Sequence, residues 1–170
     1  MGRTHDSNDD DDLEYHPPTR EEVFAQLEDW RRRLHKLYAD IISWLPEGEG
    51  YETEIRDYMT DEPPMRYVGV EPQPVPELVV RRHGESAAVF MPEACWIIGA
   101  AGRVKIFDTS RRTRPHDLVL SDRFSDEPEW RFFPHDFYAL LLNASDRRSM
   151  LRGALFNQEK LTEIVNADHG

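Results

Sequence analysis

The apolar residues between positions 20 and 45 recur at alternating spacings of four and three. They are Val23, Leu27, Trp30, Leu34, Leu37, Ile41 and Trp44. This spacing is typical of one face of an α-helix. Thr19 and Glu22 have the separation of a capping box, and Pro46 ends the pattern. The sequence therefore predicts a long amphipathic helix over residues 20–45.

The next two segments carry less regular patterns. Tyr51, Ile55, Tyr58 and Met59 would share one side of a short helix, so residues 18–62 are expected to be mainly helical. Prolines then crowd the chain between positions 63 and 76. Because proline fixes φ and lacks a backbone N–H, we expect residues 63–76 to form an extended connector.

Residues 77–133 change to the short apolar or alternating runs that predict β-strands. These runs are ELVVRRH (77–83), SAAVFM (86–91), ACWIIGA (94–100), RVKIFD (103–108) and DLVL (117–120). The gaps between them are short, which favours hairpins and antiparallel pairing. The segment WRFF at 130–133 fits either a further strand or a packed aromatic turn.

The end of the chain, residues 134–167, is expected to be helical, with Asn157 as the cap of the last helix. The predicted fold class is therefore α+β, with a long N-terminal amphipathic helix, a small antiparallel sheet of about five strands, and C-terminal helices. We expect residues 18–170 to form one domain. Residues 1–17 are expected to be a disordered acidic tail, because Asp9 to Asp12 repel one another.

The composition of the chain argues against binding of nucleic acid over the whole surface and against insertion into a membrane. The chain has 170 residues, a net charge of −12 and a single cysteine. The negative charge opposes binding of nucleic acid by the whole surface. No apolar stretch is long enough to span a membrane, and the N-terminus lacks the pattern of a signal peptide. We therefore expect a cytoplasmic protein that does not bind membranes.

The predicted helix is longer than the predicted sheet is wide. It would be about 39 Å long, whereas five strands make a sheet about 24 Å wide. Either the C-terminal helices or a second protein chain must therefore cover part of its apolar stripe. Aromatic and arginine side chains are common anchors of protein interfaces. The residues predicted to contact a partner are Trp30, Arg33, Leu37, Tyr38, Ile41 and Trp44.

Candidate chemistry is sparse. The sequence contains none of the strong catalytic or phosphate-binding motifs, so no catalytic residue, cofactor or metal site is predicted. Cys95 is expected to be a buried core residue rather than a nucleophile. The pairs His116-Asp117 and His135-Asp136 could contribute to a metal site, but neighbouring residues of a strand point to opposite faces. Gly99 to Gly102 is expected to form a tight hairpin turn.

Three function hypotheses remain. The leading one is a non-enzymatic protein-interaction module, such as an accessory or immunity-type subunit, that binds a protein partner or a second copy through the long helix. The first alternative is a nucleic-acid-associated protein that contacts phosphates through Arg111, Arg112 and Arg114. The second alternative is a small hydrolase or nuclease with a His/Asp site.

Overall fold

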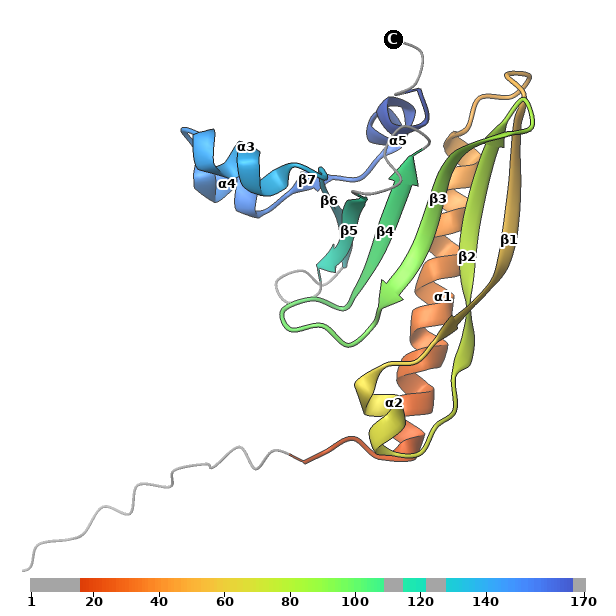
Figure 1. The fold of residues 1–170 in the computed structure, drawn as a ribbon, viewed down its shortest axis with the longest axis vertical. Coiled ribbons are helices and arrows are strands. Elements are labelled where there is room, and N and C mark those ends of the chain that lie inside the picture. Colours follow the sequence, from red (N-terminus) through yellow and green to blue (C-terminus); the bar gives the residue numbers. More distant parts are fainter. Residues whose placement is uncertain (1–15, 109–114, 122–127, 167–170) are drawn as a thin grey trace, which may run out of the picture.

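A computed structural model describes residues 16–108, 115–121 and 128–166 of the chain. It consists of one long helix, an antiparallel sheet and four short helices (Figure 1). The helices are α1 (Arg20–Trp44), α2 (Pro63–Tyr67), α3 (Phe137–Asn143), α4 (Arg147–Leu151) and α5 (Gln158–Val165). The strands are β1 (Tyr51–Thr60), β2 (Gln73–Arg82), β3 (Glu85–Ala94), β4 (Gly102–Asp108), β5 (His116–Ser121), β6 (Glu129–Phe133) and β7 (Ala154–Leu155).

The sheet has seven strands in the order of the sequence, and each strand pairs antiparallel with the next. The prediction of about five strands is therefore wrong. Residues 51–60 form β1 instead of a short helix, because pairing with β2 along ten residues satisfies the backbone groups of every second residue. Residues 130–133 belong to β6, and the two residues of β7 are too few to leave a sequence pattern.

The run at 94–100 is a second difference, because β3 ends at Ala94 and the rest of the run joins β3 to β4 instead of forming a strand of its own. Cys95 is buried, but Ile98 is fully exposed. A single bridge pairs Ile97 with Ala100 at the turn. A run of apolar residues cannot by itself distinguish a buried strand from a turn in which some apolar side chains are buried and others exposed.

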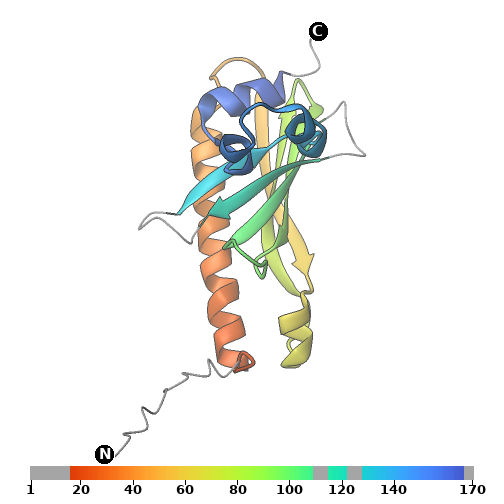
Figure 2. The ribbon, with the colours of Figure 1, turned by 90° about the vertical axis from the view of Figure 1, so that its left-hand side faces the viewer.

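Helix α1 begins where the sequence predicts. The Thr19 side chain accepts a hydrogen bond from the Glu22 N–H, and the Glu22 carboxylate accepts one from the Thr19 N–H. The helix ends at Trp44, two residues before Pro46. Its apolar face packs against the sheet, with α2 beside its start and α5 beside its end (Figure 2).

The segment predicted as a connector contains α2 and the first part of β2. The pairing with β1 explains how Pro74 and Pro76 fit into a strand. The His83 N–H donates to the Gly50 carbonyl at 2.9 Å, which sets the alternation of hydrogen-bonded pairs along β1 and β2. The odd-numbered residues of β2 therefore form the hydrogen bonds to β1. Pro74 and Pro76 lie at even-numbered positions, so their missing N–H groups remove no hydrogen bond to β1.

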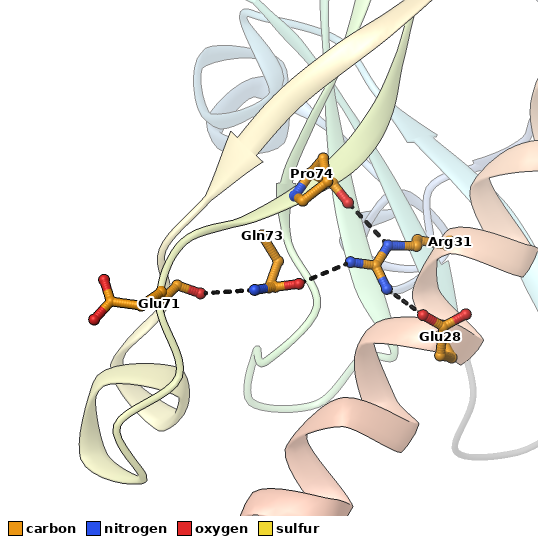
Figure 3. A network of polar contacts seen from close by, with 5 residues as sticks. All are labelled: Glu28, Arg31, Glu71, Gln73 and Pro74. Atoms are coloured by element: carbon orange, nitrogen blue, oxygen red, sulfur yellow. Dashed lines mark hydrogen bonds and ion pairs between the residues drawn. The ribbon is translucent and has the colours of Figure 1, made fainter.

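The carbonyl groups of these two prolines are bonded by side chains of α1. Arg31 Nε donates to the Pro74 oxygen at 2.8 Å, and the Tyr38 hydroxyl donates to the Pro76 oxygen at 2.9 Å. Arg31 also contacts Glu28 and lies 3.5 Å from the Gln73 side-chain oxygen (Figure 3). The paired register of β3 with β2 ends at Leu78, so α1 takes the place of a neighbouring strand here.

No helix within the described part of the chain is long and apolar enough to cross a membrane.

Candidate functional site

The residues predicted to contact a partner lie mainly inside the single chain. Trp30, Leu37, Tyr38 and Ile41 are all buried, at 2% exposure or less. The sheet, α2 and α5 together cover the apolar stripe of α1. The length of the helix therefore does not require a second chain to cover it, because α2 reaches the part that extends beyond the core of the sheet.

The other two predicted contact residues are partly exposed. Trp44 packs edge-on against Phe156, with 5.7 Å between ring centroids. Arg33 forms an ion pair with Asp29 one helical turn away. Neither residue therefore presents an unpaired anchor at the surface of α1. The predicted phosphate contacts Arg111, Arg112 and Arg114 lie outside the described residues, so that hypothesis stays a prediction.

Cys95 is buried beside a carboxylate that the sequence analysis did not single out. Glu62 is itself buried, and its two oxygens accept hydrogen bonds from the N–H groups of Cys95 at 2.9 Å and Trp96 at 3.0 Å. Burial, and secondarily the charge of Glu62, raises the pKa of the Cys95 thiol far above its usual range. A neutral thiol is a poor nucleophile, so this site is structural and Cys95 is a core residue as predicted.

A hollow of about 700 Å³ lies at the C-terminal end of the fold. Its lining combines apolar side chains with two histidines and other polar groups. The lining residues are His116, Phe132, Pro134, His135, Asp136, Phe137, Ser149, Met150, Gly153, Ala154, Lys160, Glu163 and Ile164. An apolar hollow with a few polar groups is the usual form of a small ligand site. Sequence reasoning missed it, because its lining comes from six separate elements and the segments between them.

The two histidines of the hollow contact each other. Their ring centroids are 5.2 Å apart, and His116 Nδ1 accepts a hydrogen bond from the His135 backbone N–H at 3.0 Å. His116 therefore holds its proton on Nε2, and its Nδ1 atom is engaged in the fold. Asp117 lies on the opposite face of β5, where it neighbours Arg103 and Lys105. The structure thus separates the two members of the His116-Asp117 pair, as the alternation of a strand requires.

A row of charges crosses β3, β4 and β5 on the face that carries Asp117. Glu93 forms ion pairs with both Arg103 and Lys105. Lys105 lies opposite Asp117 in the register. Burial raises the pKa of Asp117 above its ordinary value, although the two basic neighbours oppose this shift. The row contains two acidic and two basic groups, so its charges offset one another and it offers no net charge to a bound ion.

The first strand, β1, is one edge of the sheet, and the two-residue β7 is the other. Pairing with β2 occupies one side of β1, and among the described residues no strand pairs with the other side (Figure 1). Nine consecutive strand residues, 51–59, are exposed or partly exposed. They include Ile55, which is 46% exposed, and Met59, which is 56% exposed. An edge of this length is a template for another strand.

Comparison of the chain with known protein families, with curated proteins and with solved structures gives no match.

Proposed function

We propose that this protein is a non-enzymatic protein-interaction module, and that its partner adds a β-strand to the open edge of β1. The single observation that supports this proposal is the ten-residue length of that edge, with its outer backbone groups accessible. Addition of a strand supplies main-chain hydrogen bonds as the source of affinity. Exposed Ile55 and Met59 supply apolar contacts beside them.

This proposal differs from the hypothesis that the long helix binds the partner. The apolar stripe of α1 packs inside the chain, whereas β1 exposes both backbone and side chains. Natural proteins usually shield an edge by keeping it short, by covering it or by placing charged side chains along it, and within the part of the chain that the structure describes β1 uses only the last of these. β1 is neither short nor covered among the described residues, which supports its use as an interface.

A photo-cross-linking experiment tests the proposal. Benzoyl-phenylalanine is placed at Ile55, and in a matched control at His35, an exposed residue of α1. We expect irradiation in cells to give a discrete larger adduct from position 55 and none from position 35. Absence of an adduct at position 55, with the labelled protein folded by circular dichroism, contradicts the proposal.

A second candidate function, a small hydrolase with a His/Asp site, is favoured by one observation. His116, His135 and Ser149 line the same hollow. Hydrolysis of p-nitrophenyl acetate by wild type and by His135→Gln tests it. A rate that exceeds the buffer rate and falls at least about tenfold in the variant supports this function. Equal rates for the two proteins count against it.

A further inference from the structure

The register of β1 identifies which of its backbone groups face outward. The bond between His83 and Gly50 places the even-numbered residues of β1 in hydrogen-bonded pairs with β2. The N–H and C=O groups of the odd-numbered residues therefore point to the open side. These residues are Tyr51, Thr53, Ile55, Asp57 and Met59. Together they offer about ten hydrogen bonds to an added antiparallel strand.

The charges of β1 discriminate between the ways in which two copies of this strand could pair. Charged residues on an edge normally keep strands apart. A two-fold axis at Glu54 or at Arg56 sets two like charges opposite each other, and an axis at Thr53 sets Glu52 opposite Glu54. An axis at Asp57 opposes two aspartates. An axis at Ile55 sets Glu54 opposite Arg56 on both sides and opposes no like charges.

From this complementarity we infer that the partner at the β1 edge is a second copy of the same chain, paired antiparallel about a two-fold axis at Ile55. The inference rests on the proposed function, because it uses the same edge. The two Ile55 side chains meet at the centre on one face of the joined sheet. Glu54 and Arg56 of the two copies meet on the other face, at non-hydrogen-bonded positions where side chains are closest.

Ion pairs within each chain continue the series of opposite charges that meet between the two copies. Glu54 pairs with Arg81 at 2.8 Å, and Arg56 pairs with Glu77. In the dimer, a row of alternating charges therefore runs from Arg81 through Glu54 to the partner's Arg56 and the partner's Glu77. Each charge has an opposite charge on both sides or lies at the end of the row. This arrangement lets Glu54 and Arg56 keep their own pairs while they form new ones.

Exchange of charges tests the register. In Glu54→Arg the new arginine faces Arg56 of the other copy, and in Arg56→Glu the new glutamate faces Glu54. We expect wild type to be a dimer by analytical ultracentrifugation, and each variant to dimerise at least about tenfold more weakly. An equimolar mixture of the two variants restores both opposite-charge contacts between the chains, although position 54 of one chain and position 56 of the other lose their intrachain ion pairs. We therefore expect the mixture to form a heterodimer.

Arg56→Glu places a glutamate beside buried Glu77 and can lose its fold. Ile55→Arg is the second variant, because it opposes two arginines on the axis and leaves both intrachain ion pairs intact. Amide hydrogen exchange provides an independent measurement. The amides of Thr53, Ile55 and Asp57 should gain protection as protein concentration rises, whereas those of Glu54 and Arg56 should be protected at every concentration.

The outcomes separate this inference from the proposed function. A wild-type protein that stays monomeric at its highest soluble concentration overturns the inference, as does a dimer that Ile55→Arg leaves unchanged. If the cross-linker at Ile55 then captures a different protein, the proposed function stands without the homodimer. If it captures a second copy and the mixed variants dimerise, both stand.

Discussion

The hydroxyl group of Tyr38 lies 2.9 Å from the backbone oxygen of Pro76 and 3.2 Å from that of Phe90. One side chain of α1 therefore reaches both strands where their pairing ends: Phe90 is the last residue of β3 that pairs with β2, and Pro76 of β2 lies just outside the paired register. The residue is fully buried, and burial together with the charge of Glu77 raises the pKa of its phenol far above the ordinary value. Tyr38 is thus a neutral hydrogen-bond donor that joins the long helix to the sheet.

Tyr38→Phe should destabilise the protein, because it leaves a buried carbonyl without its donor. The expected loss is about 1–3 kcal/mol of the free energy of unfolding, measured by urea denaturation. Tyr67→Phe is the matched control, since Tyr67 is 71% exposed. Equal stability of Tyr38→Phe and wild type would show that the hydroxyl group contributes nothing to the docking of α1.

Gly102→Ala should also destabilise the protein, because Gly102 lies directly against the ring of Trp30. A Cβ atom at position 102 would overlap that ring, and Trp30 is buried between helix and sheet. Overpacking of this kind costs about 1–3 kcal/mol. In the double variant with Trp30→Leu the added methyl group gains room, so the cost of Gly102→Ala should shrink. Additive losses in this double-mutant cycle would contradict the contact.

Cys95 should resist alkylation in the folded protein. The thiol is 2% exposed and its pKa is raised by burial, so little thiolate is present at pH 8. We expect iodoacetamide to label Cys95 only after unfolding in urea, as followed by mass spectrometry. Rapid stoichiometric labelling of the native protein would reopen the nucleophile hypothesis for this residue.

Glu62→Ala should unfold more readily than wild type, because it removes the acceptor for the N–H groups of Cys95 and Trp96. Loss of partners for buried donors costs about 1–3 kcal/mol each. Thermal unfolding measures this effect. Glu52→Ala, at an exposed position of β1, serves as the control for loss of one negative charge.

Asp117→Asn should stabilise the protein in a pH-dependent manner. Burial raises the pKa of Asp117 above its ordinary value of 3.8 in spite of Arg103 and Lys105. The folded state therefore binds this proton more tightly than the unfolded state, and the corresponding stability is lost as the pH rises through the folded pKa. We expect the variant to melt a few degrees above wild type at pH 7.

The same comparison at low pH provides the check on Asp117. Below pH 3.8 the carboxyl group is protonated in both states, so the advantage of Asp117→Asn should vanish. Asp40→Asn, on the exposed side of α1, controls for loss of one negative charge. A gain in melting temperature that stays constant from pH 7 to below 3.8 would show that ionisation of Asp117 is not its cause.

Local patterns determined the helix ends of this protein. The Thr19 capping box, the stop before Pro46 and the Asn157 cap can be predicted because each depends on atoms within four residues of one another. The Asn157 side chain does accept from the Lys160 N–H at 3.0 Å, as expected. The short gaps between apolar runs likewise predicted antiparallel pairing for β2 to β5, since a short connection leaves few other geometries.

Tertiary pairing decided the rest. Residues 51–60 fit a helical period as well as a strand, and only the ladder with β2 selects the strand. Pro74 and Pro76 lie in β2 because α1 supplies donors to their carbonyl groups from more than thirty residues away. The burial of the apolar face of α1, the hollow near His116 and the outward backbone groups of β1 all arise from contacts between elements that are far apart in the sequence. No short stretch of sequence contains both partners of such a contact, so these features could not be predicted from local patterns.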